Sequence, residues 1–327
     1  MINVAVSTNI PIGSLEKLCP GSELCWGDCA FTLNPSDVSS FDYWIIWAGL
    51  ARRTTLQVAP CNTLFIAGEP PAKKVYPRRF YQQFHRLVCT KGDYPHDQVH
   101  FDALGLNWHL GYDRVTGRYA YGYDHLAAMT APDDKQNKVS VVCSNLSTTQ
   151  GQRDRLALLT KLKEALGDRI IHFGRGFTPI EDKLDAILPY RYHLVLENSI
   201  SDDYWTEKLS DAYLGWALPL YVGCENVDRY VSSESLVQLT GQSIETMVEL
   251  IQQQLDAGLS GAQQAGLAKA RDAVLNQYNP FARFAHWAER LYEPSVKREP
   301  VTMQPHKAFR ILGRGLLYRA RQRMRGA

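Results

Sequence analysis

Residues 192–223 read YHLVLENSISDDYWTEKLSDAYLGWALPLYVG, and this stretch decides the fold class. An apolar run from His193 to Leu196 is followed by a polar loop, a helical pattern from Trp205 to Leu214, and a second apolar run from Leu218 to Val222. Runs that are apolar at consecutive positions are typical of strands buried on both faces of a helix-covered parallel sheet. The stretch therefore predicts a β-α-β unit of an α/β protein.

The chain continues the same alternation on both sides of this stretch. Upstream, the sequence predicts a strand, a helix, a strand and a further helix, over Val139–Cys143, Gln152–Leu166, Ile170–Phe173 and residues 179–188. Downstream, residues 243–292 are helical in pattern, and Pro280 is expected at the first turn of the last helix. This is the organisation of a nucleotide-binding half of an α/β protein.

The first third of the chain predicts a sheet of the same kind. Its apolar runs are Asn3–Ser7, Cys29–Leu33, Tyr43–Trp47, Leu56–Ala59, Leu64–Ala67 and Arg86–Cys89. Residues 111–137 are expected to form an irregular connection, with Pro132–Lys138 as the linker. A chain of 327 residues is long enough for two domains. We therefore expect two Rossmann-like domains that face a cleft, over residues 1–135 and 136–300, and a C-terminal segment over residues 301–327.

Composition narrows the class of protein. The chain is 45% apolar and 21% charged, and its net charge of +2 gives no reason to expect a nucleic acid partner. Neither a signal peptide nor a run of ~20 apolar residues is visible, so a cytoplasmic protein is expected. The seven cysteines are expected to be reduced thiols. Cys25 and Cys29 form the only close pair, and His85, His96, His100 and His109 lack metal-ligand spacing, so no metal is expected.

The C-terminal segment is strongly basic. Seven basic residues and no acidic residue lie between Lys307 and Arg325. On a helix, the apolar residues Phe309, Leu312, Leu316, Ala320 and Met324 would share one face, with arginines beside it. This pattern predicts either peripheral contact with an anionic membrane, which would place the protein on the inner face of the plasma membrane, or a helix that packs on the protein's own surface.

The polar residues that follow the strand at 193–196 can bind an anionic ligand. Glu197 and Asn198 lie at the carboxyl end of that strand, and Glu207 and Lys208 lie in the first turn of the next helix. In a parallel sheet this edge faces the ligand crevice, and a helix N-terminus offers free N–H groups to a phosphate. Lys208 would add a charge for a diphosphate, whereas the carboxylates could accept from ribose or sugar hydroxyls. The alternative is that Glu207 and Lys208 are ordinary charged residues at a helix start, without a ligand.

The same stretch resembles the signature of the family 10 glycosyltransferases, the α-1,3/1,4-fucosyltransferases. That signature joins a strand ending in Glu-Asn-Ser/Thr to Tyr-Val-Thr-Glu-Lys, an Ala-aromatic pair, a strand with Pro, and Gly. The matching residues here are Glu197, Asn198, Ser199, Tyr204, Thr206, Glu207, Lys208, Ala212, Tyr213, Pro219 and Gly223. Trp205 replaces a small apolar residue, and residues 200–203 form a loop of this chain's own, which leaves the donor's base or sugar in question.

Two further stretches are similar to the family. The strand at 139–143 leads into Ser144-Asn145 and then Arg153, as in the family; because the loop is longer than usual, Arg155 is the alternative to Arg153. Upstream, Leu64-Phe-Ile-Ala-Gly-Glu-Pro70 resembles the strand end that supplies the family's proposed base, which implies that role for Glu69. Without the resemblance, Glu69 would be read as a turn residue.

The resemblance implies a GT-B fold and an inverting, metal-independent transfer of L-fucose from GDP-β-L-fucose to a glycan hydroxyl. It places the acceptor and Glu69 in the first domain. Donor binding is assigned to the second domain, to Asn145, Arg153, Glu197, Asn198, Tyr204, Glu207 and Lys208. GDP-fucose is a substrate, so no cofactor is expected.

Three alternatives stay open at this point. The acceptor could be an N-acetylglucosamine-type glycan or a lipopolysaccharide sugar, in protein glycosylation or in lipopolysaccharide biosynthesis. The donor could be another GDP-deoxysugar or a rare sugar used for surface polysaccharide. The protein could also bind a nucleotide sugar or a glycan without catalysis.

Overall fold

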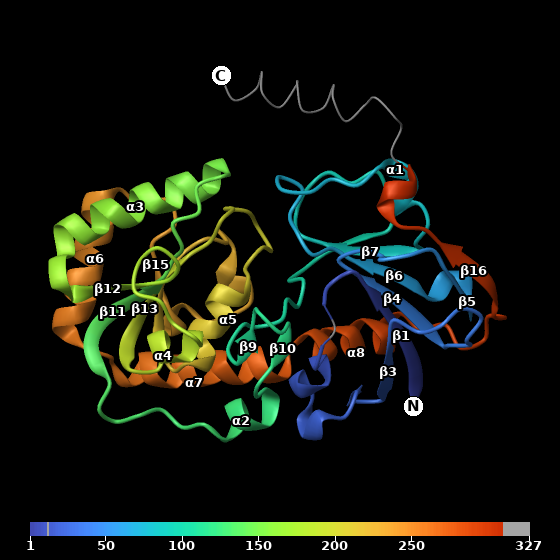
Figure 1. Cartoon of the computed structure of the whole chain (residues 1–327), viewed down its shortest axis with the longest axis horizontal. Coiled ribbons are helices and arrows are strands. Elements are labelled where there is room, and N and C mark those ends of the chain that lie inside the picture. The colour runs from blue at the N-terminus through green and yellow to red at the C-terminus, as the bar shows by residue number, and fades with distance from the viewer. Residues whose placement is uncertain (12, 310–327) are drawn as a thin grey trace, which may run out of the picture. The chain divides into compact units, whose positions relative to one another are not determined.

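The computed structural model describes residues 1–11 and 13–309 and divides into two compact units (Figure 1). Unit 1 contains Met1–Pro11, Asp28–His100 and residues 287–309. Unit 2 contains residues 13–27 and Phe101–His286. Each unit has its own parallel sheet, so the α/β class and the two Rossmann-like halves of the GT-B plan are confirmed.

The sheet of unit 2 is parallel throughout. Its strands, in spatial order, are β12 (Ile170–Phe173), β11 (Gln136–Val142), β13 (Tyr190–Leu196), β14 (Leu218–Val222) and β15 (Val237–Gln238). Because neighbouring strands run in the same direction, the loops that follow β11, β13 and β14 all lie at the carboxyl edge of the sheet. This edge carries every donor-side residue that the sequence singled out.

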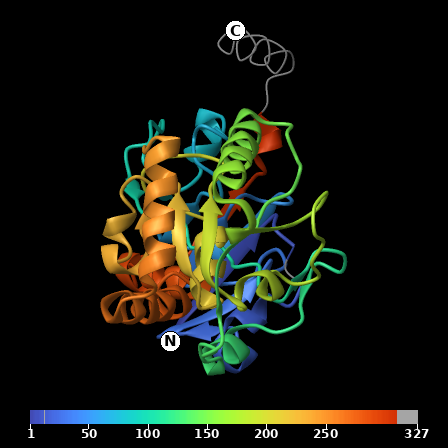
Figure 2. The same cartoon turned by 90° about the vertical axis from the view of Figure 1, so that its left-hand side faces the viewer.

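Helices cover both faces of this sheet (Figure 2). On one face, α3 (Gln150–Leu166) and α6 (Ile244–Ala257) bury Leu159, Leu162 and Ile251 against alternate residues of β11, β13 and β14. The other face meets α4 (Lys183–Ile187) and α5 (Glu207–Leu214). With apolar helices on both faces, the strands need consecutive apolar residues, which is the pattern that the sequence shows.

Unit 1 contains a second sheet, with strands in the order β3-β1-β4-β6-β7-β8, in which β3, β1, β4, β6 and β7 pair in parallel. Their bounds are β3 (Cys29–Leu33), β1 (Ile2–Thr8), β4 (Tyr43–Trp47), β6 (Thr63–Ile66), β7 (Arg86–Cys89) and β8 (Val99–Phe101). The expected strand at 56–59 is present as β5 (Thr54–Val58), but it pairs antiparallel with β16 (Glu299–Met303). Residues of β5 alternate between buried and half-buried, as a strand with one covered face does.

The boundary expected at residue 135 falls inside unit 2. Residues 101–135 carry β9 (Tyr112–Asp113), β10 (Arg118–Tyr119) and α2 (Tyr123–Ala128), so this region is not the irregular connection that the sequence indicated. It is attached by hydrogen bonds: the Asp211 carboxylate accepts from His109 N–H at 2.7 Å, and the Asp182 carboxylate accepts from Gly111 N–H at 3.0 Å. The acceptor and donor roles expected for the two domains stay predictions.

The expected linker at 132–138 is also part of unit 2. Lys135 is buried and its Nζ donates to the carbonyls of Gly215 and Trp216, which follow α5, at 3.1 and 2.7 Å. A cation at the C-terminal end of a helix satisfies carbonyls that have no partner within the helix. The strand β11 begins at Gln136. Residues 132–138 are therefore no free linker, because Lys135 is held by these hydrogen bonds and residues 136–138 are part of β11.

The remaining helices are α1 (Arg78–Tyr81) in unit 1, α7 (Gly261–Asn276) in unit 2, and α8 (Pro280–Leu291). The boundary between the two units falls within α8, between His286 and Trp287. Pro280 begins α8, as expected. The helix expected over 179–188 is confined to α4, where Asp182 is the N-cap. The basic pattern at 310–327, and with it most of the predicted membrane-contacting segment, lies outside the described residues. No helix within residues 1–11 and 13–309 combines the length and apolarity that a bilayer-spanning helix needs.

Candidate donor site at the carboxyl edge of unit 2

A buried ion pair joins the end of β13 to the start of α5. The Glu197 carboxylate accepts from the Thr206 N–H at 2.8 Å and lies 3.1 Å from the Nζ of Lys208. The Lys208 Nζ also contacts Thr206 Oγ1 at 2.9 Å. The Glu197 side chain has no exposed surface, and its oxygens are held by groups of the protein. Glu197 therefore acts as a positioning group for Lys208, whereas the sequence had suggested direct contact with the donor.

Two small features make this ion pair possible. Thr206 is the N-cap of α5, and its side chain accepts from the Lys208 N–H, which fixes the first helical turn. Gly223, which follows β14, lies so close to Glu197 that a Cβ there would be 2.6 Å from the Glu197 Cγ. The glycine in the sequence signature is thus required for packing against the carboxylate.

Lys208 is held in its charged form. Burial opposes the charge, but the carboxylates of Glu197 and Glu207 outweigh burial and raise the pKa of Lys208 above its ordinary value. The Lys208 side chain is 17% exposed, so it remains in contact with solvent at the carboxyl edge. A charged lysine at a helix N-terminus is a suitable group for a phosphate oxygen.

Glu207 lies beside Lys208, with its Oε1 3.4 Å from the Lys208 Nζ, and is 18% exposed. Burial opposes ionisation of Glu207, but Lys208, His109 and Lys183 outweigh burial and hold its pKa well below the ordinary value. An ionised carboxylate with exposed surface can accept hydrogen bonds from hydroxyl groups. Of the two glutamates in this network, Glu207 is therefore the one placed to receive a ligand.

His109 is a site residue that the sequence analysis had taken as structural. Its Nδ1 lies 3.7 Å from the Glu207 Oε1 and makes no hydrogen bond in the described structure. Burial lowers its pKa, so the imidazole is neutral at physiological pH. No local motif surrounds His109 in the sequence. Its place at the site depends on Asp211 and Asp182, which bind the backbone on either side of it.

The loop after β11 and the start of α3 bring a third group of residues to this edge. Gly151, in the first turn of α3, packs so tightly that a Cβ there would be 2.1 Å from the Asn198 carbonyl oxygen. The Oδ1 of Asn198 is buried and makes no hydrogen bond in the described structure. Asn145 lies in the loop between β11 and α3, and its N–H donates to the Arg175 carbonyl at 3.1 Å. Asn198 thus has an acceptor oxygen that the protein leaves unused.

The two arginines of α3 have different surroundings. Arg153 donates to the Ser147 carbonyl at 3.1 Å and to the Gln150 Oε1 at 2.7 Å, and it is exposed. Arg155 follows Gly151 by one turn, and its charge acts on both Cys143 and Lys208. The Nε of Arg155 is buried without a hydrogen-bond partner. Arg155, rather than the initially favoured Arg153, is therefore near enough to Lys208 for its charge to lower the pKa of that lysine.

The loop before α5, residues 200–203, is held by hydrogen bonds to Asp203. Asp203 is buried, has a φ of 61°, and accepts from Tyr230 Oη at 2.6 Å and from Arg229 at 3.1 Å. Tyr204 and Trp205 are also buried, and the Trp205 ring contacts the ring of Tyr278. Tyr204 is therefore a packed residue at the base of the loop, and direct contact with a donor stays a prediction.

Glu69 lies in unit 1, three residues after the end of β6. Its side chain is 30% exposed, and its Oε1 lies 2.6 Å from the Nζ of Lys73. Carboxylates at the carboxyl end of a parallel strand, partly open to solvent, are available for proton transfer. The structure thus places Glu69 where a base could work but shows it paired with a lysine.

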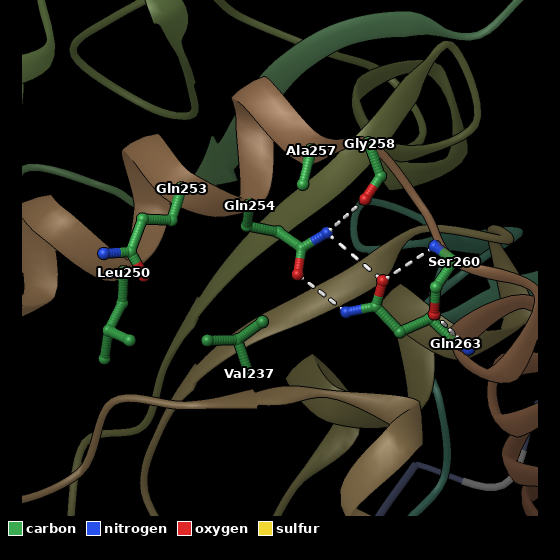
Figure 3. A pocket seen from close by; sticks show the side chains of 8 residues that line it. All are labelled: Val237, Leu250, Gln253, Gln254, Ala257, Gly258, Ser260 and Gln263. Carbon is green, nitrogen blue, oxygen red and sulfur yellow. Dashed lines mark hydrogen bonds between the residues drawn. The ribbon is translucent and has the colours of Figure 1, made fainter.

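A pocket of about 310 Å³ lies away from the donor-side residues (Figure 3). It is lined by the first residue of β15, Val237, and by the end of α6. Its polar groups are satisfied by one another: the Gln254 Nε2 donates to the Gly258 carbonyl, and the Gln263 Nε2 donates to the Gln254 Oε1. With no charged lining residue, this pocket offers nothing to a diphosphate.

The described residues contain no group of three or more His, Cys, Asp or Glu that could hold a metal ion. Lys208 and Lys183 carry positive charge near the Glu207 carboxylate, and Arg155 carries positive charge near Lys208.

Comparison with known proteins agrees with this site. Residues 132–257 match the family model "Glycosyltransferase family 10 (fucosyltransferase) C-term". Over 124 residues the chain is 29% identical to 4-galactosyl-N-acetylglucosaminide 3-alpha-L-fucosyltransferase 9 of Bos taurus and 28% identical to that of Homo sapiens. Each match covers 36% of this chain and 34% of the relative, so the chain spans about a third of the length of these relatives.

Solved structures give more distant matches. An alpha1,3-fucosyltransferase with GDP-fucose is 15% identical with a TM-score of 0.49, over 91% of this chain and 92% of that one. WaaG, a glycosyltransferase involved in lipopolysaccharide biosynthesis, is 12% identical with a TM-score of 0.43, over 89% and 99%. The matching family segment contains Asn145, both arginines of α3, and the ion pair of Glu197 with Lys208. Residues 132–257 of this chain are therefore similar to the C-terminal part of glycosyltransferase family 10, the fucosyltransferase family.

Proposed function

We propose that the protein is an inverting fucosyltransferase that moves L-fucose from GDP-β-L-fucose to a hydroxyl group of a glycan acceptor and forms an α-fucoside. The observation that carries the proposal is the charged, partly exposed Lys208 at the start of α5, held by Glu197 within a segment that matches the family 10 model. Relatives named as 3-alpha-L-fucosyltransferases support fucose as the transferred sugar.

In the proposed reaction, the acceptor oxygen attacks the anomeric carbon of the donor while the bond from that carbon to the β-phosphate oxygen breaks. Glu69 takes the proton of the acceptor hydroxyl. Lys208 and Arg155 stabilise the negative charge that develops on GDP, with Arg153 as the alternative to Arg155. Because these cations act directly on the diphosphate, we propose that transfer needs no divalent metal.

The remaining donor-side residues orient the nucleotide sugar. Glu207 is proposed to accept from the ribose hydroxyls, because it is ionised and partly exposed. The unused Oδ1 of Asn198 can accept one further hydrogen bond. Asn145 and Tyr204 are assigned to the same ligand through the family pattern. Correct orientation contributes to rate because the reacting atoms then meet without a further entropy loss.

The acceptor is proposed to be a surface glycan, of the N-acetylglucosamine type or a lipopolysaccharide sugar, on the cytoplasmic side of the plasma membrane. Peripheral contact through the C-terminal basic segment belongs to the same proposal. A test that keeps the membrane question separate uses soluble oligosaccharides.

The decisive experiment incubates the purified chain with GDP-fucose, other GDP-deoxysugars, GDP-mannose and UDP-sugars, together with lactosamine-type acceptors, and measures both released GDP and the glycosylated product. The proposal expects an α-fucosylated product from GDP-fucose. Product from a different GDP-sugar would identify another sugar transferase. Tight GDP binding with no product from any pair would identify a binding protein.

A further inference from the structure

The ammonium group of Lys208 faces three oxygen atoms of the protein. They are Thr206 Oγ1 at 2.9 Å, Glu197 Oε2 at 3.1 Å and Glu207 Oε1 at 3.4 Å. A lysine ammonium has three N–H donors, so each of these oxygens can occupy one of them. A phosphate oxygen therefore has to displace one of the three groups before it can bind Lys208 closely.

Glu207 is the group that can be displaced at the lowest cost. Its contact with Lys208 is the longest of the three and exceeds the usual N–H···O range of about 2.7–3.2 Å. Glu197 is held more firmly, because its side chain has no exposed surface and also accepts from the Thr206 N–H at 2.8 Å. Breaking that buried pair would leave an uncompensated charge in the interior. Glu207 is 18% exposed and can turn toward solvent.

The other groups that act on Glu207 are either uncharged or shared with another carboxylate. The imidazole of His109 is neutral, and its Nδ1 lies 3.7 Å from the Glu207 Oε1. Lys183 is paired with Asp211 at 2.5 Å, and the Thr206 hydroxyl donates to the Glu197 carboxylate at 2.8 Å. Glu207 is thus an ionised carboxylate that can gain stronger hydrogen bonds from a ligand than it has within the protein.

This arrangement treats phosphate ligands differently according to the hydroxyl groups they carry. A phosphate that approaches Lys208 meets the negative charge of Glu207, and like charges at this separation repel. A ribose diol offers two O–H donors to the Glu207 carboxylate, which can then leave Lys208. In a nucleoside diphosphate, the diol and the phosphates belong to one molecule. Pyrophosphate has no hydroxyl groups with which to draw Glu207 away.

We propose that Glu207 is a specificity-determining residue that makes the phosphate site at Lys208 selective for nucleotides with a ribose diol. Glu207 competes with a phosphate for Lys208 until ribose hydroxyls bind the Glu207 carboxylate. Phosphate compounds without a diol are therefore disfavoured. The inference rests on the proposed function, because it deepens the donor side of that reaction, but it does not depend on which sugar is transferred.

A fixed ion pair is the other role that the contact could have. In that case Glu207 would only hold Lys208 in place, and its removal would weaken the binding of every phosphate ligand. Glu197 already holds Lys208 through a shorter and more deeply buried contact, so a second carboxylate is not needed for that purpose. The two roles predict effects of opposite sign on ligands without a diol, which makes them separable by experiment.

The test measures the affinity for GDP, 2′,3′-dideoxy-GDP and pyrophosphate by calorimetry, with EDTA present. In Glu207→Gln, GDP should bind about three- to tenfold more weakly, because the ribose loses its charged acceptor. Pyrophosphate and the dideoxy nucleotide should bind about three- to fivefold more tightly, as the loss of a partly exposed competing ion pair implies. A gain in affinity cannot come from damage to the fold.

Two further variants and one measurement on the unmodified protein support this comparison. Glu207→Ala should show the same reversal, which excludes binding of the phosphate by the glutamine amide. Glu245→Gln removes an exposed carboxylate from the first turn of α6 and should bind all three ligands as the unmodified protein does. In the unmodified protein, guanosine should raise the affinity for pyrophosphate and 2′,3′-dideoxyguanosine should not, because only the former brings the diol.

Pyrophosphate binding that is unchanged or weaker in both Glu207 variants would overturn the proposal. Tighter binding of GDP as well would show that Glu207 merely repels anions, and would overturn its role toward the ribose. A protein that binds none of the three ligands would contradict both the inference and the proposed function. Fucose transfer without the reversal would leave the proposed function standing alone, whereas the reversal without transfer would leave only the inference.

Discussion

The Nδ1 atom of His109 lies 3.7 Å from the Oε1 atom of Glu207, although 98 residues separate them in the sequence. The contact exists because the carboxylates of Asp182 and Asp211 hold residues 109–121 beside α4 and α5. A neutral imidazole beside an ionised carboxylate limits the positions that the carboxylate can take. His109 is thus placed to orient Glu207 toward a ligand without contacting the phosphates.

We therefore predict that His109→Phe weakens donor binding selectively. The ring volume is kept, but the contact of Nδ1 with Glu207 is lost, so KM for GDP-fucose should rise about three- to tenfold, the effect of roughly 1 kcal/mol. KM for the acceptor should stay unchanged. His125→Phe, which changes an exposed histidine of α2, is the control. Discrimination between GDP and a 2′,3′-dideoxy analogue should also fall in His109→Phe. Unaltered discrimination would mean that His109 does not act through Glu207.

The pH dependence of this site follows from the same pair. Burial lowers the pKa of His109 to about 3, and the pKa of Glu207 lies well below its ordinary value. Both groups therefore keep one protonation state from pH 5 to pH 8, so neither group should make GDP affinity depend on pH across that range. Ionised Glu207 contributes to folding stability above the pKa it would have in the unfolded chain, and that contribution disappears as pH falls through its folded pKa. An inflection in GDP binding between pH 6 and 7 that vanishes in His109→Phe would contradict the assignment of a neutral imidazole.

The two arginines of α3 should differ on substitution. Arg155→Ala is expected to weaken GDP binding, because Arg155 acts on Lys208, whereas Arg153→Ala should mainly loosen the start of α3, where Arg153 holds the Ser147 carbonyl. A hydrogen bond to a charged group contributes about 1.5–3 kcal/mol, so the Arg155 effect should be roughly ten- to a hundredfold. Calorimetry with GDP measures this directly. A larger loss of GDP affinity in Arg153→Ala would restore the assignment first favoured from the sequence.

Glu69→Gln should reduce transfer by roughly 10²- to 10⁴-fold, because the substitution keeps the shape of the side chain and removes the base. GDP affinity should barely change, since the nucleotide is assigned to unit 2. Asp93→Asn provides a control that removes an exposed carboxylate from unit 1 and should have little effect. If Glu69→Gln turns over normally, or loses GDP binding to the same extent as activity, Glu69 has no part in acid–base catalysis.

Transfer should persist in excess EDTA. In the proposed mechanism, Lys208 and Arg155 supply the positive charge that a divalent ion provides in metal-dependent transferases. The measurement is product formation before and after chelation, with manganese and magnesium added back. Activity that is lost on chelation and returns only with a metal would show that these cations are insufficient.

Much of the fold could be predicted from sequence because its strands are apolar at consecutive positions. The ranges Cys29–Leu33, Tyr43–Trp47, Ile170–Phe173 and Leu218–Val222 were expected with the bounds that the structure shows. β5 was assigned to the parallel sheet by mistake, since Thr54–Val58 alternates and pairs with β16, more than 240 residues later. Partners at such a distance leave no local signal.

The site was predictable where a short motif encodes it and unpredictable where tertiary contacts create it. Glu207 and Lys208 are adjacent in sequence and lie together at the start of α5. His109 was missed because its position depends on hydrogen bonds from the backbone to carboxylates of α4 and α5. The distinct surroundings of Arg153 and Arg155 arise from the close contact of Gly151 with Asn198, which the spacing of the loop does not reveal.

The attachment of residues 109–121 to α4 and α5 also limits how this protein can be recombined with its relatives. A chimaera that exchanged only residues 132–257 would separate Asp182 and Asp211 from the backbone N–H groups they bind, and would leave these carboxylates beside an unrelated segment. Asp211 would keep its ion pair with Lys183 and Asp182 its bond from the Leu184 N–H, but each carboxylate would lose a hydrogen-bond donor, which costs stability. Exchange of residues 132–257 between homologues should therefore give a stable protein only when residues 13–27 and 101–131 are exchanged with them. The segment that folds as one unit is then longer than the segment that matches the family model.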